Sequence, residues 1–441
     1  MFERGLQASL FMPLMPMKVS LLLGLLFAVL VHAEDDFEQP PIEYSKSTPG
    51  NAISELQAKI DRGEKQLAFD KEHGYLPSLL ELLEIPIESQ MLVFSKTSLQ
   101  LRRISPRTPR AIYFNDDVYV GYCQSGDVLE ISTADPKLGT VFYTLDQRQK
   151  EKPSFTRQTE NCLVCHASSR TEGIPGHLAR SVFVDPSGQL ILSAGSHTID
   201  YRTKLEDRWG GWYVTGTHGS QKHQGNLIIR TEEVPRSPDN SQGMNVTDLS
   251  RRFDVSKYLT PHSDIVALMV LEHQIVVHNQ ITKAHFTAEQ ALAYEKEINR
   301  AFGEPEGTKL ESTTRRIQSA GDDLVEALLF ADEAPLDHPI EGTSGYAAVF
   351  APRGLRDKSG RSLRDFDLHK RMFKYPCSYL IYSPSIDQLP NEMNEYVWKR
   401  LWEILGEGKG GKSFQHLTTD GRQAIIEILR DTRRGLPAYW N

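Results

Sequence analysis

The chain has 441 residues, of which 39% are hydrophobic and 24% charged, and its formal net charge is -8 at pH 7. This composition is ordinary for a soluble globular protein with one large core or two smaller ones, and it excludes a disordered or fibrous chain. A mildly acidic chain without blocks of Lys or Arg is also a poor candidate for binding nucleic acid.

The first residues have the pattern of an export signal. Lys18 precedes an apolar run from Val19 to Val31, and the small residue Ala33 ends a cleavage-like tripeptide. Because the run is too short to cross a bilayer comfortably, we expect residues 1–33 to be a cleaved signal peptide, with an uncleaved membrane anchor as the alternative. No second long apolar run follows, so we expect no membrane span after cleavage and a periplasmic, extracellular or cell-surface location.

The next part of the chain is expected to be rich in β-structure. Residues 34–52 are acidic and rich in Pro and Ser, which predicts a flexible lead-in. Apolar spacing then predicts helices over 53–69 and 77–83. Short β-branched and aromatic runs between turn residues predict an antiparallel meander. Its expected strands are 111–114, 118–120, 128–131, 141–145, 181–184, 189–192, 212–215 and 226–230.

The second half of the chain has helical spacing. A stretch rich in Pro, Ser, Asn and Gly at 235–243 is the best candidate for a boundary. Helices are expected at 265–284, 288–302, 312–330, 392–405 and 421–433. We therefore predict an α+β protein, with a β-rich region at 53–234 and a mainly helical region at 244–441 packed on it.

One short motif carries the strongest chemical signal. Cys162 and Cys165 are separated by two residues, and His166 follows directly. Two thiols at this spacing match the two vinyl groups of haem, and the adjacent histidine is then held under the iron as an axial ligand. The motif predicts one covalently attached haem c, and an export signal agrees with this because c-type haem is attached outside the cytoplasm.

Two rival interpretations of the cysteine pair are open. A thioredoxin-like redox pair requires a strand-to-helix turn of a βαβ unit, and a zinc site requires two more ligands. The remaining cysteines, Cys123 and Cys377, lie in aromatic, strand-like surroundings. We expect them to be buried and unpaired, although one disulfide between them is an alternative in an oxidising compartment.

The function of a haem depends on the other face of its iron. A second strong-field ligand gives an electron carrier, whereas an open face lets a small molecule bind and react. No Met lies between Cys165 and Met244, and this stretch is predicted to form strands. We therefore do not expect the small all-helical cytochrome c fold, in which a Met completes the iron site.

Several histidines are candidates for the distal position. His197, His218 and His223 lie in loops with nearby glycines, which let a backbone approach a planar cofactor closely, and His177 has a similar setting. The plainer interpretation is that they are polar loop residues, and a second metal centre has only weak support. His273 falls in an apolar helical stripe, where it presses on a porphyrin or is simply a core residue.

Three longer stretches carry a resemblance: PRAIYFNDDVYVG at 109–121, WGGWYVTGTHG at 209–219 and YPCSYLIY at 375–382. With the haem motif, they resemble a family of large, exported, single-haem cytochrome c domain proteins of environmental bacteria, over most of the chain after about residue 75. The family has no assigned activity. The resemblance therefore implies haem binding and export without naming a substrate, and it implies that the loop from Trp209 to His218 lies near a functional site.

From the sequence we expect a single-haem electron carrier with an unidentified redox partner protein. Its proximal ligand is His166, and its distal ligand is among His218, His197 and His273. The alternatives are a peroxidase-like haem oxidoreductase with an open distal face, and a haem-based sensor or structural haem domain.

Overall fold

The computed structural model describes residues 36–231, 234–235 and 238–440, so the predicted signal peptide lies outside the described residues. Its centre is a seven-stranded antiparallel sheet with the order β6-β5-β4-β3-β2-β1-β9. The strands are β1 (Met91–Val93), β2 (Arg110–Phe114), β3 (Val118–Tyr122), β4 (Val128–Asp135), β5 (Gly139–Asp146), β6 (Phe155–Gln158) and β9 (Trp212–Tyr213). The predicted antiparallel meander is thereby confirmed from β2 to β5, whereas the sequence did not predict β1 and β6.

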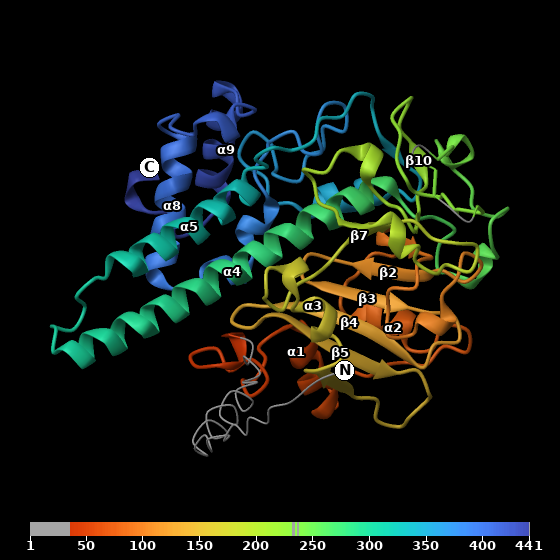
Figure 1. Ribbon diagram of the computed structural model, residues 1–441, viewed down its shortest axis with the longest axis horizontal. Coiled ribbons are helices and arrows are strands. Elements are labelled where there is room, and N and C mark those ends of the chain that lie inside the picture. Colours follow the sequence, from red (N-terminus) through yellow and green to blue (C-terminus); the bar gives the residue numbers. More distant parts are fainter. Residues whose placement is uncertain (1–35, 232–233, 236–237, 441) are drawn as a thin grey trace, which may run out of the picture.

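Successive side chains along each strand point to opposite faces of the sheet, and both faces are covered. On β3, Val118 and Val120 belong to a cluster with α1 (Ala52–Asp61) and α2 (Leu76–Leu82). Tyr119 belongs instead to the cluster on α4 (Ile265–Phe302), which covers the other face. Figure 1 shows α4 beginning beside the sheet and running well past it.

The second half is mainly helical, as predicted. α4 is a single helix of 38 residues, although the sequence suggested two helices with a break near 285–287. It continues through this point because Phe286 and Ala288 are buried there. The further helices are α5 (Glu311–Leu328), α6 (Tyr346–Phe350), α7 (Pro384–Asp387), α8 (Asn391–Leu405) and α9 (Thr419–Thr432). Figure 1 shows α5 returning along α4, with α8 and α9 packed beyond it.

Some local expectations are wrong. The part of the predicted flexible lead-in that the structure describes is packed, because Phe37, Ile42 and Tyr44 are buried, and the hydroxyl of Tyr44 donates to the carbonyl of Thr140 at 2.9 Å. The first helix ends at Asp61 rather than near residue 69. Neither 189–192 nor 226–230 forms a strand, and a left-handed backbone at residue 226 (φ 69°) interrupts the second of these stretches.

The sheet and the helical half share one hydrophobic cluster, which contains Phe114 and Tyr119 from the sheet together with Val270 and Leu324 from α4 and α5. The stretch 235–243 therefore connects two regions that pack on each other. Among the described residues, no helix combines the length and the apolar character that a membrane crossing requires.

Candidate functional site

The cysteine–histidine motif follows the edge strand β6, with Cys162 at the N-cap of the one-turn helix α3 (Leu163–His166) and the other motif residues within it. The carbonyl of Cys162 accepts hydrogen bonds from the backbone N–H groups of Cys165 (3.2 Å) and His166 (3.0 Å). Residues three and four positions apart share one side of a helical turn, so both thiols and the imidazole are presented together. Both cysteines are unpaired, with Cys165 exposed and Cys162 half-buried.

The imidazole of His166 is fixed from behind. Its Nδ1 lies 2.9 Å from the carbonyl oxygen of Gly176, and the N–H of Gly176 donates to the carbonyl of His166 at 2.8 Å. A carbonyl oxygen only accepts, so Nδ1 carries the proton and Nε2 carries a free lone pair. Burial lowers the pKa of His166, which favours this neutral form. No residue within the described ranges hydrogen-bonds to Nε2.

Helix α4 positions the carbonyl that holds this histidine. The side chain of Asn279 accepts from the backbone N–H of His177 at 2.9 Å and donates to its carbonyl at 2.9 Å. A Cβ atom on Gly176 would lie 2.6 Å from Oδ1 of Asn279, so only glycine fits between the loop and the helix. The helical half of the molecule therefore sets the orientation of the His166 ring.

The sheet face beside α3 contributes residues that sequence reasoning missed. Phe142 on β5 contacts the ring of His166, with 4.9 Å between the ring centroids. Arg110 and Glu130 form an ion pair at 2.9 Å on the same face, and both charges act on the pKa of His166. The signal in the sequence was only the strand alternation, which cannot say which short segment will cover that face.

The thiol of Cys162 is not activated as a nucleophile. Burial raises the pKa of Cys162 to about 11, and the nearby negative charge of Glu130 acts in the same direction. At neutral pH this thiol is therefore protonated. Between the two cysteines, the side chain of Val164 is 78% exposed, which leaves an apolar group uncovered at the centre of the motif.

The first of the three distal candidates, His197, is a surface residue of a two-stranded ribbon. It is exposed on β8 (Ser196–Thr198), which pairs with β7 (Arg180–Val182). The guanidinium of Arg180 donates to Oγ of Ser196 at 2.6 Å. Burial lowers the pKa of Arg180, and the charge of Arg170 acts in the same direction. The electrostatic effect of Cys165 opposes this change. The β7–β8 ribbon therefore lies within electrostatic reach of the motif.

His218 lies elsewhere, directly after β10 (Gly216–Thr217), and follows β9 at the opposite edge of the sheet from β6. Its ring packs against His223, with centroids 4.7 Å apart, and its Nε2 accepts the N–H of Asn245 at 3.0 Å. Trp209, at the start of the same stretch, is completely buried. The loop that the resemblance placed near a functional site is thus joined to the motif by no contact within the described residues.

His273 is a core residue on α4. Its ring stacks on Phe330 at 4.0 Å between centroids, and its Nε2 lies 2.8 Å from Oγ of Ser378. His177 is also buried, against Tyr119 at 4.3 Å between ring centroids. It directly follows Gly176, whose carbonyl oxygen lies 2.9 Å from Nδ1 of His166.

The remaining cysteines are both buried and unpaired, as expected for Cys123 and Cys377. Within the described ranges, no three His, Cys, Asp or Glu side chains are grouped as ligands for a metal ion. In comparisons with known proteins, no family description, curated protein or solved structure matches this chain.

Proposed function

We propose that this chain is an exported single-haem c-type cytochrome that transfers single electrons. The observation that carries the proposal is the state of His166, whose ring is fixed through Nδ1 and whose Nε2 is free, on the same helical turn as two unpaired thiols. A proximal haem ligand needs this combination, because the bond at one ring nitrogen sets the tautomer and orients the other toward the metal.

The residues present fit a covalently attached haem. Cys162 and Cys165 are free thiols at the spacing of the vinyl groups, and exposed Val164 lies between them where an apolar macrocycle would cover it. When bound, haem supplies an iron that changes its charge by one electron. The chain's own contribution is to hold the axial imidazole: the Gly176 carbonyl accepts the Nδ1 proton, which makes Nε2 a stronger ligand.

The rival interpretations of the cysteine pair have less support. A thioredoxin-like pair needs a lowered thiol pKa at a βαβ turn. Here the pKa of Cys162 is raised to about 11, and the motif follows an antiparallel edge strand. A zinc site needs further ligands, and no such group accompanies the motif in the described part of the chain.

A second candidate function, a haem oxidoreductase with an open distal face, is favoured by one observation. The Nε2 atoms of His218 and His273 are already engaged, by the backbone of Asn245 and the hydroxyl of Ser378. Among the three distal candidates, this leaves exposed His197 as the ligand of a closed electron carrier. If His197 does not bind the iron, the sixth position is open to a small oxidant.

Optical and EPR spectra of the purified ferric protein distinguish the two functions. A carrier closed by His197 is low-spin and ignores added cyanide, and its His197→Ala variant becomes high-spin and binds cyanide. A wild-type protein that is already high-spin, and that binds cyanide or reacts with peroxide, would contradict the closed carrier and support the oxidoreductase.

Covalent attachment has its own test. The double variant Cys162→Ala, Cys165→Ala should lose all haem on denaturing extraction, because no thioether then links the chain to the porphyrin. The matched control is Cys123→Ala, which removes a buried, unpaired thiol outside the motif and should keep the haem. If the double variant retains haem after denaturation, attachment through this motif is refuted.

A further inference from the structure

A cavity of about 270 Å³ lies away from the haem motif, between the turn that joins β2 to β3 and two loops of the helical half. Its charged and polar lining includes Asp116, Asp117, Arg353, Arg364, Tyr379 and Ser383. The volume is enough for a small metabolite, and convergent polar groups in a preformed hollow are the usual features of a small-molecule site.

Arg364 is a fixed but incompletely bonded cation in this cavity. Its guanidinium packs over the rings of Phe350 and Tyr379, 4.6 and 4.3 Å from their centroids, and the side chain is only 9% exposed. Its Nη2 is bonded to Asp116, whereas buried Nη1 has no hydrogen-bond partner among the described residues. Leaving such an N–H unpaired is costly, so the site is prepared for an acceptor.

Asp117 supplies an unpaired charge of the opposite sign. Its carboxylate takes part in no hydrogen bond or ion pair given by the described residues, and it does not contact Arg364 although both line the cavity. Burial raises the pKa of Asp117 to about 6, and the charge of Asp116 adds to this effect. The charge of Arg364 opposes this rise, but Arg364 is bonded to Asp116, so the Asp117 carboxylate has no cation bonded to it and a bound ammonium group would provide one.

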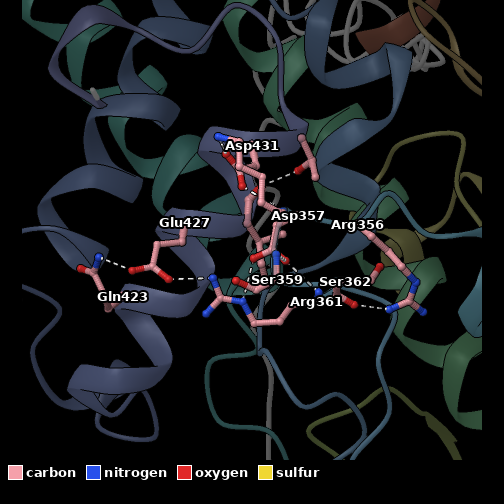
Figure 2. Close-up of polar contacts among 12 residues, drawn as sticks. Arg356, Asp357, Ser359, Arg361, Ser362, Gln423, Glu427 and Asp431 are labelled. Atoms are coloured by element: carbon pink, nitrogen blue, oxygen red, sulfur yellow. Dashed lines mark hydrogen bonds and ion pairs between the residues drawn. The ribbon is translucent and has the colours of Figure 1, made fainter.

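The wall that carries Arg364 is held in place by ion pairs to α9 (Figure 2). Arg361 binds Asp357 at 2.7 Å and Glu427 at 2.6 Å, and Lys358 binds Asp431 at 2.7 Å. These contacts fix the loop directly before residues 362–364, and the ion pair of Arg356 with Asp365 at 3.1 Å fixes it directly after them. The cavity is therefore preformed rather than assembled by its ligand.

We propose that this cavity binds a small zwitterion of the α-amino-acid class, with its carboxylate on Nη1 of Arg364 and its ammonium group on Asp117. A simple anion would leave Asp117 unpaired and would be repelled by it, and a simple cation would leave Nη1 of Arg364 unpaired. Exposed Arg353 lies at the mouth, where it attracts the carboxylate. This inference does not depend on the bound haem.

Calorimetric titration of the full protein with each standard amino acid, with acetate and with methylammonium tests the proposal. We expect at least one amino acid to bind with a Kd below about 1 mM, and the two single-charge probes to bind at least about tenfold more weakly. The proposal would be overturned if no amino acid binds in this range. It would also be overturned if acetate binds equally well, because that would indicate a plain anion site.

Two variants place the binding. Asp117→Asn keeps the shape of the side chain and should weaken amino-acid binding by at least about tenfold. Arg364→Lys should weaken it as much, because lysine lacks the guanidinium fork. The control Asp127→Asn changes an exposed aspartate outside the cavity and should leave the affinity unchanged. Because Arg364 also contacts the core, Asp117→Asn decides the matter: an unchanged affinity in this variant would refute the site.

Discussion

The motif segment and helix α4 use histidine in opposite ways. His166 lies in a short, half-exposed turn, and the protein bonds only one of its ring nitrogens. On α4, His273 and His278 are buried, and their Nε2 atoms bond the hydroxyl of Ser378 and the carbonyl of Asp116, each at 2.8 Å. Neither an abundance of histidines nor an unbonded ring nitrogen therefore locates a metal site, because Nδ1 of His273 also has no partner among the described residues. His166 differs in that its unbonded Nε2 lies on the same helical turn as two unpaired thiols.

The two regions also differ in how far their apolar side chains are exposed. Val164 in the motif is 78% exposed, while Val270 on α4 is completely buried. The motif lies at the edge of the sheet in short elements that present their groups outward, and α4 is bonded to both the sheet and the other helices. The first region presents an uncovered surface, and the second holds the molecule together.

The largest expected effect is acid unfolding driven by the buried histidines. Burial lowers the pKa of His223 and His273 to about 3 and that of His285 to about 4. The unfolded chain therefore binds more protons below pH 6.5, so stability is present above that pH and is lost as the pH falls toward the folded values. At pH 4.5 each histidine should lower the free energy of unfolding by about 2 kcal/mol. Calorimetric melting from pH 8 to 4.5 measures this loss.

A variant isolates one of these contributions. His273→Phe keeps a ring stacked on Phe330 but removes the titrating group, so the melting temperature should fall less steeply below pH 6.5. A wild-type melting temperature that stays constant from pH 7 to 4.5 would show that these histidines are not buried in the neutral form.

Next in size is the loss of packing in His273→Ala. Truncation removes the ring stacked on Phe330 and leaves the hydroxyl of Ser378 without its partner, at a cost of about 3 kcal/mol in the free energy of unfolding. Denaturant titration measures this cost, and the ferric haem spectrum should not change. Exposed His369→Ala is the matched control, with little effect on stability or on the spectrum. A spectrum altered by His273→Ala would place that residue at the iron and show that His273 is not only a core residue.

A smaller effect is expected where the two regions meet. In Gly176→Ala the new Cβ would lie 2.6 Å from Oδ1 of Asn279, so this side chain must release the backbone of His177. We expect a loss of about 1–2 kcal/mol and a changed ferric spectrum, because the carbonyl that holds Nδ1 of His166 moves. Gly50→Ala, with nothing within 4 Å of its Cβ, is the control. A destabilised protein with an unchanged spectrum would show that the bonds between Asn279 and His177 do not orient the ligand of the proposed iron site.

Much of this fold follows from local pattern. The strands between Arg110 and Asp146 were predictable because apolar alternation and turn residues agree there. The continuity of α4 was not, because Thr287 reads as a helix start and only the burial of Phe286 and Ala288 overrides that signal. The packed segment after residue 35 was missed because its Pro-rich and acidic composition hides three buried apolar side chains.

At the site, the three motif residues were predictable because the chemistry fixes their spacing within one helical turn. The carbonyl of Gly176 was not, because the loop after the motif must fold back onto the His166 ring. The amide of Asn279 was not, because it bonds a segment about a hundred residues away. The distal candidates were chosen by residue type and neighbouring glycines. Neither property reveals that the Nε2 of His218 is bonded to Asn245.

The smallest expected effect concerns the tuning of the iron by the sheet. Arg110 and Glu130 form an ion pair beside His166, so Arg110→Gln removes a positive charge and leaves the carboxylate uncompensated. The extra negative charge stabilises the oxidised iron, so the reduction potential of the proposed haem should fall by on the order of 50 mV. Spectroelectrochemical titration measures this shift, and Arg148→Gln, at an arginine that is 84% exposed, should leave the potential unchanged. An unchanged potential in Arg110→Gln would mean that the iron lies beyond the reach of this pair, and that the motif presents its haem wholly outside the sheet.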